Sequence, residues 1–160
     1  MIKKAIYAGS FDPFTKGHEQ IVLDSAKIFD EVTILLAVNS DKRRRLNILS
    51  CENAIKETFK DNPKIKVESY KGFVVDYCKK NGINYLIRGL RNSNDFTYEE
   101  NIAKINAELN PDVKTIYFRT SNEIISSSMV WELYIGGKDV SKFLPAPIYK
   151  ILNEHTRSQL

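Results

Sequence analysis

The stretch from Gly9 to His18 holds the residues whose types and spacing best suit chemistry on a phosphate. An apolar run precedes it and an amphipathic run follows it, which predicts a strand, a tight loop and a helix. Such a loop brings backbone N–H groups and the positive end of a helix dipole to one point. His18 lies at the expected helix start, and Ser10 and Thr15 add hydroxyl groups nearby. The stretch therefore predicts a phosphate site, with a capping histidine as the alternative.

Candidate site residues also follow each of the other predicted strands. In chain order they are Lys42, the segment 72–74, Arg88 with Arg91, and the serines 126–128. Ligands of open parallel sheets bind beyond the carboxyl ends of the strands. We therefore expect these residues to converge on one site with the Gly9–His18 stretch.

The elements that must position these residues alternate between strand and helix along the chain. The predicted strands are 2–8, 32–38, 65–70, 83–87 and 114–119, and the predicted helices are 21–29, 50–59, 73–80, 95–109, 126–135 and 147–155, before a frayed tail at 156–160. Ser50 and Asp95 are the expected N-caps of the second and fourth helices. Ile102, Ile105 and Leu109 should share one helix face. Such alternation predicts a single domain (1–160) with an α/β, Rossmann-like, doubly wound five-stranded parallel sheet and helices on both faces.

Composition excludes several classes of protein. The chain has 160 residues, 42% hydrophobic and 28% charged, which is ordinary for a soluble globular domain. Its apolar runs are far too short for a membrane span, and the N-terminus lacks the apolar core of a signal peptide, so we expect a cytoplasmic protein without a membrane partner. Two cysteines and two distant histidines make a zinc site improbable. A net charge of +4 suits polyanionic small molecules, and charge alone is weak evidence for nucleic acid.

Three motifs in order resemble a known family. Gly9-Ser10-Phe11-Asp12-Pro13 followed by Thr15-x-Gly17-His18 resembles nucleotidyltransferases with a (His/Thr)-x-Gly-His motif. Ile87-Arg88-Gly89-Leu90-Arg91, Asp95-Phe96-x-Tyr98-Glu99 and Ile125-Ser126-Ser127-Ser128 narrow the resemblance to bacterial phosphopantetheine adenylyltransferases. It runs from about residue 4 to Pro145, and the motifs are specific because they occur together.

The resemblance implies transfer of AMP from ATP to 4′-phosphopantetheine, giving dephospho-coenzyme A and pyrophosphate. It implies catalytic roles for His18, Lys42 and Arg91; ATP contacts from Ser10, Phe11, His18, Gly89, Leu90, Arg91, Glu99, Ser126, Ser127 and Ser128; and phosphopantetheine contacts from Ser10, Lys42, Val74, Arg88 and Asn106. It also implies Mg²⁺ as the counterion of ATP, no protein-bound metal, and a homohexamer.

Each assignment has a simpler alternative. Arg91 is equally suited to pair with Asp95, Glu99 to be a surface carboxylate, and the serines to be N-caps. The run 43–45 reads as a solvated basic loop. The chain departs from the family at 49–53, where Leu-x-x-Glu-Arg is usual, and at the shortened segment 120–124, which holds adenine contacts. A CTP-dependent relative and a non-catalytic nucleotide sensor are the alternative functions.

Overall fold

Five parallel strands form one sheet in this computed structural model, which describes residues 1–39, 41, 43–120 and 126–158. The strands are β1 (Lys4–Gly9), β2 (Glu31–Ala37), β3 (Ile65–Tyr70), β4 (Tyr85–Leu90) and β5 (Lys114–Arg119). Their order in the sheet is β3-β2-β1-β4-β5, with every neighbouring pair parallel. β1 is therefore central, and its carboxyl end leads directly into the loop that holds Ser10. The predicted Rossmann-like fold is confirmed.

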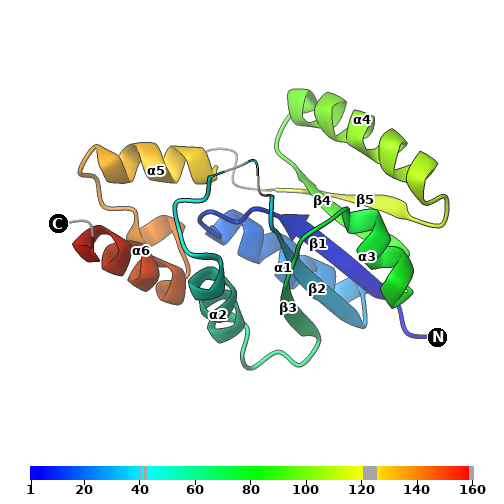
Figure 1. The fold of residues 1–160 in the computed structure, drawn as a ribbon, viewed down its shortest axis with the longest axis horizontal. Coiled ribbons are helices and arrows are strands. Elements are labelled where there is room, and N and C mark those ends of the chain that lie inside the picture. Colours follow the sequence, from blue (N-terminus) through cyan, green and yellow to red (C-terminus); the bar gives the residue numbers. More distant parts are fainter. Residues whose placement is uncertain (40, 42, 121–125, 159–160) are drawn as a thin grey trace.

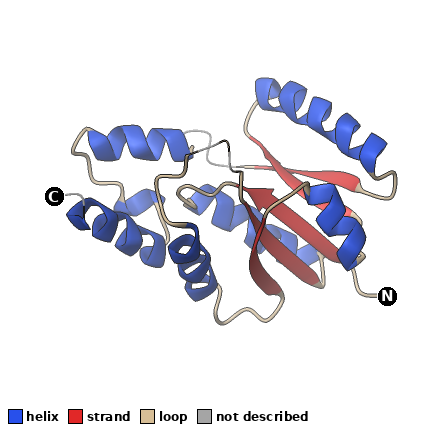
Figure 2. Cartoon of the chain, viewed as in Figure 1, coloured by secondary structure: helices blue, strands red, loops and turns tan. Residues whose placement is uncertain are grey.

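Helices cover both faces of this sheet (Figure 2). They are α1 (Lys16–Ile28), α2 (Ile48–Thr58), α3 (Val74–Asn81), α4 (Ser93–Leu109), α5 (Ser127–Ile135) and α6 (Ala146–Ser158), with a short 3₁₀ helix η1 (Ser141–Phe143). Figure 1 shows α5 and α6 at the end of the molecule toward which β1 points, and α4 over the side formed by β4 and β5. α6 packs against α2. The carboxyl ends of the strands thus face α5.

The alternation of side chains along the strands explains why both faces are covered. Ala5 and Tyr7 of β1 belong to one buried cluster, which includes residues of α1, α2, α5 and α6. Ile6 and Ala8 belong to a second buried cluster on the opposite face, against α3. Successive side chains of a strand point to opposite faces, so a strand that is apolar throughout must be covered twice. This pattern is the physical basis of the doubly wound fold.

Two predicted N-caps are wrong. α2 begins at Ile48 because the side chain of Asn47 accepts the backbone N–H of Ser50 at 3.1 Å, so Asn47 is the cap. α4 begins at Ser93 because Asn92 accepts the N–H of Asp95 at 3.0 Å. In both helices the N-cap is an asparagine three residues before the predicted one. The side chain of an N-cap accepts the backbone N–H of the third helical residue, which is the residue that had been predicted as the cap.

Two predicted boundaries and the expected packing of one helix face also need correction. β4 continues through Arg88, Gly89 and Leu90, which were expected in a loop, because these residues pair with Tyr117–Arg119 of β5. α6 covers 146–158, so residues 156–158 are helical and do not belong to a tail. The expected apolar face of α4 is largely exposed: Ile105 is 60% exposed, and Leu109 is 58% exposed.

Candidate active site

A cavity of about 330 Å³ opens at the carboxyl ends of β1 and β4, beside the N-terminus of α1. We call it the main pocket. Its lining includes the predicted site residues Ser10, Phe11, His18, Arg88, Gly89, Arg91, Glu99, Ser126 and Ser127. Four predicted contacts, Leu90, Val74, Asn106 and Ser128, are not part of this lining. Lys42, predicted to be catalytic, lies outside the described residues. The expected convergence on one site thus holds for most of the described candidates.

His18 closes a capping box at the start of α1. Thr15, the N-cap, accepts the backbone N–H of His18 at 3.4 Å, while the Nδ1 atom of His18 accepts the backbone N–H of Thr15 at 2.9 Å. A ring nitrogen that accepts a hydrogen bond carries no proton. The proton of the neutral imidazole therefore lies on Nε2, which makes His18 a hydrogen-bond donor through its second nitrogen. Both interpretations of His18, as a cap and as a donor to the pocket, are compatible.

Aromatic side chains surround the His18 ring. The ring centroids of Phe11 and Phe14 lie 5.1 and 5.4 Å from that of His18, and the centroid of Tyr7 lies at 6.2 Å. Desolvation in these surroundings, and then the positive charge of Arg91, lower the pKa of His18 from 6.5 to about 4. The imidazole is therefore neutral at physiological pH and can donate a proton to a hydrogen bond without carrying charge.

Arg88 is held in a bidentate pair with Glu99. Its Nε and Nη2 atoms donate to the two carboxylate oxygens at 2.6 and 2.8 Å, and Nη1 donates to the carbonyl of Ala8 at 3.1 Å. The side chain of Arg88 is 25% exposed and that of Glu99 is 12% exposed. Glu99 is therefore not a surface carboxylate. A guanidinium has five N–H groups, so two remain available on Nη1 and Nη2.

Arg91 forms the pair with Asp95 that the spacing of four residues had left open. Its Nε donates to the Asp95 carboxylate at 2.9 Å, and its backbone N–H donates to the same oxygen at 3.0 Å. This hydrogen bond lowers the pKa of the Asp95 carboxyl and raises that of Arg91. Both arginines of the main pocket thus have a carboxylate partner.

The serines at the start of α5 have separate roles. Ser126 is the N-cap of α5 and accepts the N–H of Met129 at 3.0 Å. This is the capping role that the sequence offered as the alternative to a contact with ATP. Ser127 donates its hydroxyl to the carbonyl of Pro13 at 2.8 Å. Ser128 lines an adjoining cavity. The start of α5 is therefore tied to the loop that follows β1.

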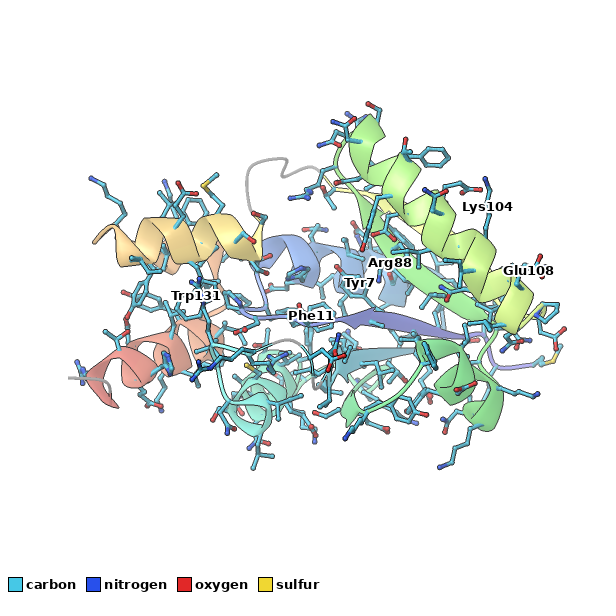
Figure 3. All side chains as sticks on the ribbon, turned by 45° about the horizontal axis from the view of Figure 1, so that its top comes forward. Tyr7, Phe11, Arg88, Lys104, Glu108 and Trp131 are labelled. Carbon is cyan, nitrogen blue, oxygen red and sulfur yellow. The ribbon has the colours of Figure 1, made fainter. Side chains whose placement is uncertain are left out.

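The basic run 43–45 is held against the same loop, although Arg43 and Arg45 are exposed, as expected of a solvated basic loop, and only Arg44 is half-buried. The Asp12 carboxylate accepts the backbone N–H groups of Arg45 and Leu46 at 2.8 and 3.0 Å. Arg44 donates from Nη1 to the carbonyl of Ser10 at 2.5 Å. The Arg45 guanidinium lies 4.9 Å from the ring centre of Trp131, a cation–π contact. Figure 3 labels Trp131, and also Tyr7, Phe11 and Arg88, which line the main pocket.

Several residues that line the pocket were not predicted, among them Tyr7, Ile21 and Thr120. Tyr7 reads as core because its strand is apolar throughout, yet it also lines the pocket. Ile21 lies so close to Gly89 that a Cβ on Gly89 would come within 2.4 Å of its Cδ1 atom. Thr120 follows β5, and its buried Oγ1 has no hydrogen-bond partner among the described residues. The position of Thr120 directly after a strand is the one sequence signal that could have identified it.

The described part of the chain contains no group of three or more histidine, cysteine, aspartate or glutamate side chains placed to hold a metal ion. The two carboxylates of the main pocket, Asp95 and Glu99, are both bound by arginines. No described helix is long and apolar enough to cross a membrane.

Comparison with known proteins agrees with this geometry. A family model described as cytidylyltransferase-like matches residues 6–133. A phosphopantetheine adenylyltransferase of Flavobacterium psychrophilum is 42% identical over 149 residues, covering 92% of this chain and 98% of the relative. The enzymes of the same name from Cytophaga hutchinsonii and Staphylococcus carnosus are 42% and 39% identical, covering 94% of this chain and 100% and 95% of the relatives.

Proposed function

The chain belongs to the cytidylyltransferase-like family, and within it to the phosphopantetheine adenylyltransferases, and from this premise we infer its reaction. It transfers the adenylyl group of ATP to 4′-phosphopantetheine, which gives dephospho-coenzyme A and pyrophosphate, a step of coenzyme A biosynthesis. The observation that best supports this reaction is the neutral His18 at the start of α1, in a pocket that the arginines of β4 also line.

His18 can stabilise the reaction without acting as an acid. The acceptor phosphate attacks the α-phosphorus, and negative charge accumulates on the oxygens of the transferred group. Because Nδ1 is occupied by the Thr15 N–H, Nε2–H is the ring's donor, and it stays protonated across the physiological range. A preorganised donor of this kind contributes most where charge develops. We assign this role to His18 at the α-phosphate.

The two arginines divide the substrates between them in this proposal. Arg88 is fixed by Glu99 and keeps two N–H groups, which suits bidentate capture of the phosphate of 4′-phosphopantetheine. Arg91 lies after β4 and is held by Asp95, which suits a contact with the phosphates of the nucleotide. Ser10 and Lys42 complete the acceptor site as the resemblance implies. The contacts proposed for Glu99 with ATP, and for Val74 and Asn106 with the pantetheine arm, rest on the resemblance alone.

Mg²⁺, in this proposal, enters as the counterion of ATP and leaves with pyrophosphate. The pairing of Asp95 and Glu99 with arginines supports this view, because it leaves no free carboxylate among the described lining residues of the main pocket for a resident ion. Activity should therefore require Mg²⁺ in proportion to ATP. A tightly bound metal that survives dialysis in chelator, detected by elemental analysis, would contradict the proposal.

Assembly and location belong to the same proposal. We expect a homohexamer in the cytoplasm, as the resemblance implies. The large exposed apolar residues of α4, at the open edge of the sheet beside β5, support an oligomer: Phe96, Tyr98, Ile105 and Leu109 are 46–66% exposed. Figure 3 shows Lys104 and Glu108 projecting from this helix. Light scattering coupled to gel filtration should give a hexamer mass, and a monomer would contradict it.

Pyrophosphate release is the direct test of function. The purified chain should release pyrophosphate from ATP, Mg²⁺ and 4′-phosphopantetheine, and the adenylylated product should be dephospho-coenzyme A by mass spectrometry. A panel of nucleotides separates the alternatives. Turnover with CTP and none with ATP would favour a cytidylyltransferase, and binding of ATP without turnover would favour a sensor.

A further inference from the structure

The charged side chains of the main pocket balance one another. Among its described lining residues, Arg88 is paired with Glu99, Arg91 is paired with Asp95, and His18 is neutral. A nucleoside triphosphate brings several negative charges into the site, and more charge develops on the leaving group during transfer. Paired arginines supply directed hydrogen bonds but little net charge. The compensating charge must come largely from outside this lining.

A second cavity, of about 360 Å³, adjoins the main pocket and shares Ser10 and Ser127 with it. We call it the arginine cavity. Its lining is Ser10, Asp12, Arg43, Arg44, Arg45, Ser127, Ser128, Trp131, Glu132 and Ile135. The lining of the arginine cavity therefore contains three guanidinium groups and two carboxylates. None of the ion pairs between described residues involves these arginines.

Neutral groups hold two of these arginines in place. Arg44 donates to the carbonyls of Ser10 and Leu46 at 2.5 and 3.3 Å and to the sulfur of Cys51 at 3.5 Å, which leaves two of its N–H groups. Arg45 lies over the Trp131 ring, whose Nε1 donates to the Asp12 carbonyl at 2.8 Å. Because their partners carry no charge, both guanidinium groups are positioned while their full charge is retained. This arrangement is unlike that of Arg88 and Arg91.

We propose that the arginine cavity binds the pyrophosphate portion of the nucleotide: the β- and γ-phosphates of ATP before transfer and free pyrophosphate after it. The proposal rests on the function inferred above. In that reaction an oxygen of the acceptor phosphate forms a bond to the α-phosphorus. The bond from the α-phosphorus to the bridging oxygen breaks, and its electron pair leaves with pyrophosphate. The N-terminus of α5, at Ser127 and Ser128, flanks the same cavity and adds backbone donors.

The reverse reaction isolates this role, because pyrophosphate and dephospho-coenzyme A are then separate substrates. We compare Arg43→Gln/Arg45→Gln with Lys79→Gln/Lys80→Gln, which removes the same charge from the exposed last turn of α3. The arginine variant should raise KM for pyrophosphate about tenfold and change KM for dephospho-coenzyme A less than about twofold. The lysine variant should change neither by more than about twofold. An unchanged KM for pyrophosphate, an equal rise in both KM values, or an equal effect of the lysine variant would overturn the proposal.

Calorimetric titration with pyrophosphate separates this inference from the reaction on which it rests. The wild-type chain should bind pyrophosphate more tightly than the arginine variant at about 0.1 M salt, with the difference reduced at high salt. The single variant Arg43→Gln gives the same comparison if the double variant does not fold. Normal adenylyl transfer with unaltered pyrophosphate binding overturns the arginine cavity alone. If the wild type makes no ATP from dephospho-coenzyme A and pyrophosphate, the proposed function itself fails.

Discussion

The protonation of His18 can be measured directly, because the chain has only two histidines. Desolvation and the charge of Arg91 lower the pKa of His18 from 6.5 to about 4. An NMR titration of the imidazole signals should therefore show one ring that stays neutral until the pH approaches 4. The ¹⁵N shifts of that ring should place its proton on Nε2, because Nδ1 accepts the Thr15 N–H. His155→Gln removes the other set of signals and so assigns them.

The same pKa predicts how stability depends on pH. The unfolded chain takes up a proton at His18 near pH 6.5, whereas the folded chain does so only near pH 4. Protons therefore favour the unfolded state between these values. At about 1.4 kcal/mol for each pH unit, the loss of unfolding free energy is at most about 3–4 kcal/mol. None of this loss occurs above pH 6.5, and it is complete below about pH 4.

His18→Gln is the variant that tests this reasoning. Glutamine at this position of a capping box can accept the Thr15 N–H, so the helix start is preserved without a titrating group. At pH 7 the variant should keep its urea-unfolding free energy within about 0.5 kcal/mol, while kcat falls about a hundredfold or more. Between pH 6.5 and 4.5 it should lose less stability than the wild type. A His18 that titrates near 6.5, or equal losses in both proteins, would refute the account.

Two further pairs of variants test the supports of the site. Glu99→Gln leaves Arg88 without its bidentate partner and should lower the unfolding free energy by about 1–2 kcal/mol. The control Glu100→Gln, on the same helix turn, should lower it by less than about 1 kcal/mol. Equal urea midpoints for the two variants would contradict the role given to the Arg88–Glu99 pair. Asn47→Ala removes the observed cap of α2 and should lower the unfolding free energy by about 1 kcal/mol, whereas Ser50→Ala should change it by no more than about 0.5 kcal/mol. The opposite order of the two variants in thermal unfolding would identify Ser50 as the cap.

The fold was predictable where one local rule dominates. β3 (65–70) and β5 (114–119) have the predicted bounds, because each is a short segment with β-branched and aromatic residues that follows an Asn-Pro turn signal. The end of β4 was not predictable, because Arg88 and Gly89 are poor strand formers and become strand only by pairing with β5. The exposure of the apolar face of α4 was not predictable for a similar reason. Helical spacing predicts that Ile105 and Leu109 share a face, but it does not predict whether another element of the fold packs against that face.

Most of the described site residues predicted from the sequence line the main pocket, but the electrostatics of the pocket were not predictable. Arg91 and Asp95 are four residues apart, so their pairing was a foreseeable alternative. Arg88 and Glu99 come from a strand and a helix that only the tertiary fold brings together. The contacts of Arg44 with the loop after β1 cross thirty-four positions of the chain. A local pattern can identify a cation, but whether that cation is neutralised depends on distant residues.

The loop after β1 illustrates how distant residues prepare an anion site. Three of its carbonyl oxygens are occupied from other elements: Ser10 by Arg44, Asp12 by Trp131, and Pro13 by Ser127. A free carbonyl oxygen near a phosphate would repel it, because both are hydrogen-bond acceptors. Engagement of these oxygens by donors from the arginine run and from α5 removes that repulsion. The same contacts fix the arginine cavity beside the main pocket, so the elements that engage these carbonyl oxygens also place positive charge next to that pocket.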